Sequence, residues 1–96
     1  IGHYSFRPID KSMHDNRNEH KIRLTEKETA IVKFLYLASD SVVSRDTLLG
    51  EVWGYNVGVT THTLETHVYR LRQKIEEDPS NAMILVTEPT GYRIIC

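Results

Sequence analysis

The spacing of apolar residues predicts a first helix that begins just after Thr25. Its apolar positions fall on one helical face: Ala30, Ile31, Phe34, Leu35 and Ala38. The run Thr25-Glu26-Lys27-Glu28 has the form of a capping box, in which the Thr25 hydroxyl accepts a backbone hydrogen bond while the Glu28 side chain reaches back. The polar residues 39–41 are expected to end this helix, and its apolar face is expected to lie in the core.

A second, shorter helix is predicted after Ser44, a favourable N-cap residue that is followed by Asp46 in the first turn. Gly54 is expected to stop the helix. Its apolar stripe consists of Leu48, Leu49, Val52 and Trp53. The residues after Gly54, up to Val59, are expected to form a loop.

A third helix should begin at Thr60 or Thr61 and run to about Asp78, because Pro79 cannot continue a helix. Its apolar residues are spaced by four, three and four positions, and such a stripe must face the core. They are Leu64, Val68, Leu71 and Ile75. With a short link to the second helix, these segments predict a compact helical core.

Both ends of the chain show β-strand patterns. Residues 4–7 and 21–24 alternate between apolar and polar side chains, which predicts short strands of a small antiparallel sheet. Near the C-terminus, the β-rich runs 83–87 and 92–95 flank Glu88-Pro89-Thr90-Gly91, whose proline and glycine positions fit a type I turn. The predicted fold is therefore α+β, with an N-terminal antiparallel sheet, three helices and a C-terminal β-hairpin.

Length and composition limit the class of protein. A chain of 96 residues has room for one domain, residues 1–96, and its 40% hydrophobic and 26% charged residues are ordinary for a globular domain. No apolar run approaches the roughly 18 residues that a membrane-spanning helix needs. Cys96 is the single cysteine, which excludes an internal disulfide and suits a cytoplasmic setting. Because the chain starts at Ile1 without an initiator methionine, we expect it to be part of a longer protein.

The formal net charge of -1 argues at first against a nucleic-acid partner, since nucleic-acid binders usually carry a basic surface. The distribution of charge changes this picture. Within the third predicted helix, Arg70, Arg72 and Lys74 come before the acidic run Glu76-Glu77-Asp78. A chain that is slightly acidic overall can therefore still carry a local basic stripe.

The exposed side of the third helix is rich in hydrogen-bonding groups. At about 100° per residue, the side opposite the core stripe carries His62, Thr66, Tyr69, Arg70 and Gln73. Its flanks carry Thr63, His67 and Lys74 on one side and Glu65 and Arg72 on the other. In a DNA major groove, arginine, glutamine and the threonine methyl group read guanine, adenine and thymine. Taken alone, the pattern also fits an idle solvated face, but the preceding short helix and the following hairpin favour a DNA-reading helix.

Four motifs make the chain resemble the effector domain of OmpR/PhoB-type response regulators over essentially its whole length. They are Leu24-Thr25-Glu26-Lys27-Glu28, Val43-Ser44-Arg45-Asp46-Thr47-Leu48-Leu49 with Val52-Trp53-Gly54, the helical segment 64–75, and Thr90-Gly91-Tyr92-Arg93. The resemblance implies a winged helix-turn-helix fold with a four-stranded N-terminal sheet. It also implies transcription regulation by sequence-specific binding to double-stranded DNA, with the third helix, about 61–78, in the major groove and the hairpin as a wing near the minor groove.

The resemblance further implies roles for individual residues. The implied base-proximal groups are His62, Thr66 and Arg70, to which the exposed helix face adds Tyr69 and Gln73. The implied contacts to the DNA backbone are Arg45, Trp53, Thr63, His67, Arg72 and Tyr92, to which we add the flanking Lys74.

The resemblance implies partners beyond DNA. An N-terminal receiver domain, phosphorylated by a sensor kinase, is expected outside this chain. The loop Tyr55, Asn56, Val57, Gly58 and Val59 matches the segment that in relatives can contact RNA polymerase. Because relatives bind direct-repeat half-sites in pairs, we expect a monomer for the isolated domain and a dimer for the full-length protein.

The wing departs from the family pattern. Where many members carry arginine followed by glycine at the tip, this chain has Glu88-Pro89. Arginine is attracted by the negative potential of a narrow minor groove, which a glutamate opposes. The wing residues considered for DNA contact are Thr87, Glu88, Thr90 and Arg93. For Arg93, a structural or solvated role has equal support.

Other functional classes have weaker support. His62 and His67 are five residues apart, which is the wrong spacing for the zinc pair of a His-Glu-x-x-His helix, so no metal site is expected. Ser44 is better explained as a helix cap than as a nucleophile, and the glycines do not form a phosphate-binding loop. We therefore expect neither an enzyme nor a cofactor. The alternative function is a winged-helix module for protein interaction, which the near-neutral charge and Glu88 would suit.

Overall fold

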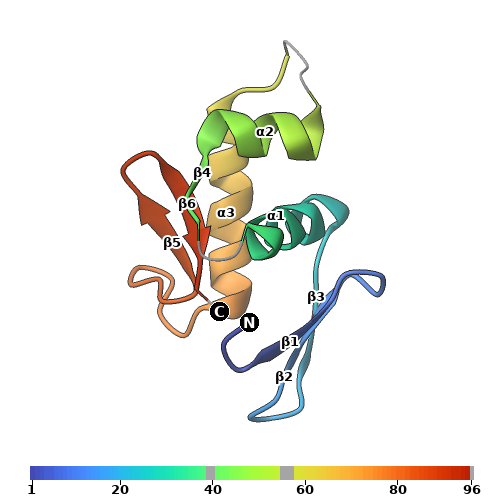
Figure 1. Ribbon diagram of the computed structural model, residues 1–96. Helices are drawn as coiled ribbons and strands as arrows, with labels where there is room; N and C mark the ends of the chain where they lie inside the picture. Colours follow the sequence, from blue (N-terminus) through green and yellow to red (C-terminus); the bar gives the residue numbers. More distant parts are fainter. Residues whose placement is uncertain (39–40, 55–57, 96) are drawn as a thin grey trace.

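A computed structural model describes residues 1–38, 41–54 and 58–95. In these ranges α3 runs through the middle of the molecule, α1 and α2 pack against it, and the C-terminal hairpin lies along its side (Figure 1). The first three strands form a separate layer at the end of the molecule away from α2 (Figure 1). The described elements are β1 (Tyr4–Arg7), β2 (Ser12–Asp15), β3 (Lys21–Arg23), α1 (Glu26–Leu37), β4 (Val43–Ser44), α2 (Arg45–Trp53), α3 (Thr61–Ile75), β5 (Leu85–Glu88) and β6 (Gly91–Ile94).

The caps of the first two helices are those that the sequence predicts. At α1 the Glu28 backbone N–H donates to the Thr25 hydroxyl at 3.1 Å, and the Thr25 N–H donates to the Glu28 carboxylate at 2.8 Å. At α2 the Ser44 hydroxyl accepts from the backbone of Thr47 at 3.1 Å. The helix ends at Gly54, whose φ of 80° is a conformation that glycine adopts without strain. Local sequence signals therefore fix both helix starts and the end of α2.

The third helix ends at Ile75, three residues earlier than the sequence predicts. Glu76 leaves the helix with φ -90° and ψ 143°, and its buried carboxylate accepts backbone hydrogen bonds from Met83, Ile84 and Leu85. These bonds turn the chain back toward β5. The sequence predicts an end near Asp78, because Pro79 cannot continue a helix. It does not reveal that the Glu76 carboxylate accepts hydrogen bonds from backbone N–H groups seven to nine residues further on.

The two sheets are antiparallel, and they differ from the prediction in their strand content. Within the described residues the N-terminal sheet has three strands in the order β1-β2-β3, not four. Strand β2 is not predicted from the sequence, because it carries buried Ser12 and Asp15 among its four residues and so lacks an apolar-polar alternation. The second sheet has the order β4-β6-β5. Here β4 has two residues, too few for a recognisable pattern.

The predicted hairpin is confirmed, with β5 beginning at Leu85 instead of residue 83. Gly91 opens β6 opposite Ser44 of β4. A Cβ atom on Gly91 would lie 1.9 Å from the backbone oxygen of Val43, which is far inside a van der Waals contact. Only glycine lets β4 approach this closely, so Gly91 ties the wing to the start of α2.

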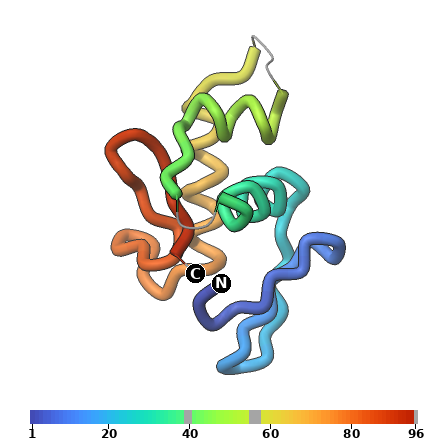
Figure 2. Tube along the Cα trace, viewed as in Figure 1, coloured from blue at the N-terminus to red at the C-terminus, as the bar shows by residue number. Residues whose placement is uncertain are grey.

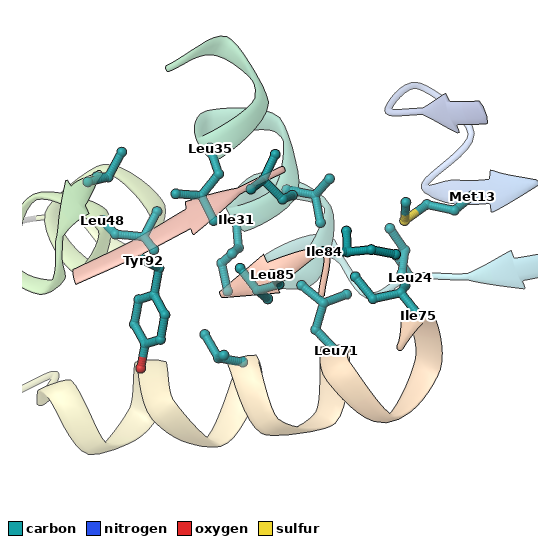
Figure 3. Close-up of a cluster of buried hydrophobic side chains, with 14 of the residues drawn as sticks. Met13, Leu24, Ile31, Leu35, Leu48, Leu71, Ile75, Ile84, Leu85 and Tyr92 are labelled. Atoms are coloured by element: carbon teal, nitrogen blue, oxygen red, sulfur yellow. The ribbon is translucent and has the colours of Figure 1, made fainter. Parts of the chain in front are cut away.

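The hydrophobic core lies between α3, α1 and the hairpin (Figure 3). The predicted α3 stripe is confirmed, because Leu64, Val68, Leu71 and Ile75 are all buried. From the hairpin, Tyr92 extends toward α3, and Leu85 packs in the same cluster (Figure 3). None of the helices in the described ranges is long and apolar enough to cross a membrane.

A partly buried ion pair joins α1 to the end of α3. The Lys74 ammonium lies 2.6 Å from Oε1 of Glu28 and also donates to the Arg23 carbonyl at 3.1 Å. Burial alone would raise the pKa of the Glu28 carboxyl, but the hydrogen bonds from Lys74 and from the Thr25 backbone hold that pKa below its ordinary value. Lys74 therefore stabilises the fold through a group that must stay ionised.

Lys74→Ala is expected to lower the free energy of unfolding at neutral pH by about 1–2 kcal/mol, because it leaves a buried carboxylate without its cation. Folding lowers the Glu28 pKa, so the pair contributes fully above the unfolded pKa of about 4.3 and its contribution is lost as the pH falls through the lower folded pKa. Urea unfolding over a pH series measures the difference. Lys33→Ala, at an exposed position of α1, is the matched control. A Lys74→Ala loss that persisted unchanged in acid would contradict the role of Glu28.

Candidate nucleic-acid interface

The solvent-facing side of α3 carries the side chains that the sequence analysis assigns to base contact. Tyr69 is 60% exposed. His62, Arg70 and Gln73 are also exposed, and Thr66 is half-buried. α3 is the central helix of the molecule, and the hairpin lies beside it in the tube view (Figure 2). The five predicted side chains are thus brought together along one helix face.

Hydrogen bonds within this face orient some of its groups. The Gln73 amide nitrogen donates to the Tyr69 hydroxyl at 3.0 Å, and the Thr66 hydroxyl donates to the His62 carbonyl at 3.0 Å. Arg70 makes no hydrogen bond or ion pair with any described residue. Its guanidinium group, which has five N–H donors, is therefore available to an external acceptor.

Tyr92 is a platform for two arginines where the wing meets the helices. The guanidinium carbon of Arg45, at the start of α2, lies 5.1 Å from the centre of the Tyr92 ring. That of Arg72 lies 5.9 Å from the same ring. Cations at such distances from an aromatic ring are attracted by its negative face. Tyr92 therefore holds positive charge from two helices in one place.

Arg72 also binds the wing directly. Its Nε donates to the Leu85 carbonyl at 2.9 Å, and Nη2 donates to the Thr87 hydroxyl at 2.7 Å. Arg72, which the resemblance implies as a contact to the DNA backbone, thus also binds two residues of β5. These bonds fix the hairpin against α3 and leave the remaining N–H donors of Arg72 for another acceptor.

A second cluster joins α2 to α3. The Trp53 indole meets the His67 ring edge-on at 4.9 Å, and the Lys27 ammonium lies 5.8 Å from the indole ring centre. His67 Nδ1 lies 2.8 Å from the Thr63 carbonyl, so this nitrogen must carry the proton, and Nε2 remains for another partner. Lys27 is not among the residues predicted from the sequence, because nothing in its position on α1 reveals a contact with α2.

Other predicted residues lie apart from these clusters. Lys74 is bound to Glu28 near the end of α3. On the wing, Arg93 pairs with Glu88, while Thr90 is exposed in the turn. Gly58 and Val59 lead into α3, whereas Tyr55, Asn56 and Val57 of the predicted polymerase loop lie outside the described residues. No group of three or more histidine, cysteine, aspartate or glutamate side chains in the described ranges could hold a metal ion.

Cationic side chains lie on and around the exposed face of α3, where they can bind anions. Free or partly free cationic groups of Arg45, Arg70 and Arg72 lie on or beside α3, and the first two come from adjacent helices. The polar side chains of His62, Thr66, Tyr69 and Gln73 add hydrogen-bonding groups on the exposed side of α3. Such a surface can bind a polyanion along its edges and distinguish hydrogen-bonding patterns at its centre.

The curated relatives are regulators that are longer than this chain. The chain is 40% identical over 91 residues to a "Probable transcriptional regulator ycf27" of Porphyridium aerugineum, covering 91% of the chain and 38% of the relative. It is 42% identical over 78 residues to the "Sensory transduction protein RegX3" of Mycolicibacterium smegmatis, covering 80% of the chain and 34% of the relative. The chain therefore spans little more than a third of each relative.

A solved structure and a family model agree with these similarities. The DNA-binding domain of Bacillus subtilis CssR superposes with a TM-score of 0.80 at 27% identity, covering 96% of this chain and 99% of that one. The predicted winged helix-turn-helix fold is thereby confirmed. A family model described as "Transcriptional regulatory protein, C terminal" matches residues 18–94. The chain belongs to this family, as its resemblance to OmpR/PhoB-type effector domains implies.

Proposed function

We propose that the chain is the DNA-binding output domain of a two-component response regulator, which binds double-stranded DNA in a sequence-specific manner to regulate transcription. The observation that carries the proposal is the exposed face of α3. On this face Arg70 has no hydrogen-bond or ion-pair partner among the described residues. The helix lies within residues 18–94, which match the regulator family. An α-helix fits the major groove, and arginine is the commonest reader of guanine there. The CssR domain, which shares the fold, is named for DNA binding.

The residues divide into two roles. The base-reading group is centred on Arg70 and comprises His62, Thr66, Tyr69, Arg70 and Gln73. The backbone-contacting group borders it and comprises Arg45, Trp53, Thr63, His67 and Arg72, and the buried Tyr92 supports it by holding Arg45 and Arg72 in place. Phosphate contacts set the position of a protein on DNA, whereas contacts to base edges specify the sequence. Lys74 is left out of both groups because its ammonium is engaged by Glu28.

The wider proposals follow from the family and from the greater length of the relatives. A receiver domain, phosphorylated by a sensor kinase, would accompany this domain in the full protein. The loop 55–59 would contact RNA polymerase, and two copies would bind direct-repeat half-sites. The isolated domain would be a monomer, the full-length protein a dimer, and both would be cytoplasmic.

A salt titration of DNA binding tests the central proposal. Selection from a random duplex pool first provides a cognate duplex, and its affinity is then measured by fluorescence anisotropy at rising salt. A domain that contacts several phosphates is expected to lose affinity steeply, with a log-log slope of about -0.9 for each contact. A scrambled duplex of equal length is the control and should bind more weakly at every salt concentration.

Two outcomes would count against the proposal. If no duplex is enriched in the selection and none binds at low salt, the domain is not a DNA reader, and the protein-interaction alternative gains support. If the selected and scrambled duplexes bind equally at all salt concentrations, the binding is electrostatic alone, and the assignment of α3 as a sequence reader is wrong.

A further inference from the structure

The outer face of the wing holds an ion pair between Glu88, at the end of β5, and Arg93 on β6. The strand register pairs Val86 with Arg93 and Glu88 with Gly91, so their side chains lie on one face of the hairpin. The opposite face carries the buried Tyr92. Nη2 of Arg93 lies 3.2 Å from Oε1 of Glu88. Many family members carry an arginine at the position of Glu88. In this chain the position holds a carboxylate instead, and this carboxylate pairs with Arg93.

The ion pair holds the Arg93 side chain but leaves some of its N–H donors without a hydrogen-bond partner among the described residues. One nitrogen of the guanidinium group donates to Glu88, whereas Nε is buried and has no hydrogen-bond partner among the described residues. The side chains of Arg93 and Glu88 are 35% and 28% exposed. Ion pairs that water reaches to this extent are weak. A stronger or better placed anion can therefore take the place of the Glu88 carboxylate.

The other cations around the wing lack such a competitor. The guanidinium carbons of Arg45 and Arg72 lie 5.1 and 5.9 Å from the centre of the Tyr92 ring, on the side of the hairpin that faces the helices. Among the described residues neither forms an ion pair with a carboxylate. The wing thus has one side with uncompensated positive charge and one side where the charge is cancelled.

We propose that Arg93 is a latent phosphate ligand of the wing and that Glu88 is its intramolecular competitor, which keeps this side of the wing from binding the DNA backbone. The proposal rests on the DNA-binding function proposed above. A DNA phosphate and the Glu88 carboxylate compete for the same N–H donors of Arg93. Glu88 thereby removes one sequence-independent contact from the interface, and more of the recognition is left to α3.

The test measures the salt dependence of DNA binding in variants of the 96-residue chain. The probe is a short mixed-sequence duplex, because phosphate contacts are independent of sequence. The variants are Glu88→Gln, which keeps the shape and removes the charge, and the double variant Glu88→Gln/Arg93→Gln. Glu19→Gln, an exposed carboxylate beside the N-terminal sheet, is the matched charge control. Thermal unfolding establishes that each variant is folded, and Glu88→Ser replaces the glutamine variant if that one is not.

If the proposal is right, Glu88→Gln binds about threefold or more tightly at low salt, and its log-log salt slope steepens by about 0.9, the increment of one phosphate contact. The double variant returns to the slope of the unmodified chain, and the Glu19 control leaves the slope unchanged. An unaltered slope in Glu88→Gln overturns the proposal. So does equal steepening in the double variant, since Glu88 would then act by its own repulsion. If the unmodified chain binds no duplex, the DNA-binding proposal itself fails.

Discussion

Replacing Arg70 by alanine is expected to weaken binding to the cognate duplex by about 1–3 kcal/mol, about a tenfold to hundredfold loss, and to relax the preference at one base pair. Arg70 lies on the exposed face of α3 and has no partner among the described residues, so its donors are available for a base edge. The measurement compares affinities for the cognate duplex and for its single-base-pair variants. The free energy of unfolding should stay nearly unchanged, because the side chain is exposed and makes no hydrogen bond or ion pair with the described residues.

Two arginine variants serve as controls for the Arg70 prediction. Arg7→Ala removes the same charge from an exposed position at the end of β1, and it is expected to leave base preference intact. Arg72→Ala removes the hydrogen bonds to Leu85 and Thr87, so it should lower both stability and the affinity for every duplex. If Arg70→Ala weakened all duplexes by one common factor, Arg70 would be a phosphate contact and the assignment of a base-reading role would be wrong.

The helices could be predicted from the sequence because their signals are local. A capping box, an N-cap serine and an apolar stripe act within a few residues, and each has the predicted effect at Thr25, Ser44 and along α3. The end of α3 was predicted incorrectly for the opposite reason. It depends on the Glu76 carboxylate, whose backbone partners belong to the segment leading into β5. Contacts between segments that are separated in the sequence do not appear as a periodic pattern of apolar and polar residues.

The charged residues of the candidate site show the same limit. On a helical wheel Arg70 lies opposite the core stripe, whereas Arg72 and Lys74 lie on its two flanks. The fold distinguishes them, because Arg72 binds the wing, Lys74 binds Glu28, and Arg70 is left for an external partner. Whether a long charged side chain stays in solvent or binds an internal acceptor depends on which groups the tertiary structure places near it. The sequence therefore predicts which helix face and flanks form the interface, and the structure shows which of these cations already bind groups within the fold.

Glu76→Ala is expected to lower the free energy of unfolding by about 3 kcal/mol or more, because it leaves two buried backbone N–H groups and one partly buried one without an acceptor. The carboxylate oxygens accept from Met83 at 2.8 Å, from Ile84 at 3.1 and 3.2 Å, and from Leu85 at 2.8 Å, while Glu76 is 8% exposed. Each donor left without an acceptor in a buried position costs about 1–3 kcal/mol. Small domains have about 5–15 kcal/mol in total, so this loss is a large share.

Urea unfolding followed by far-UV circular dichroism measures the effect. Glu77→Ala is the neighbouring control, since the Glu77 side chain is 74% exposed and its ion pair with Arg17 should contribute little. Glu76→Gln keeps one carbonyl acceptor and should lie between the unmodified chain and Glu76→Ala. Equal losses for Glu76→Ala and Glu77→Ala would contradict the role of the buried carboxylate. Because these bonds place β5 beside α3, Glu76→Ala should also displace Leu85 and Thr87 from Arg72, and DNA affinity should then fall for all sequences alike even where the variant remains folded.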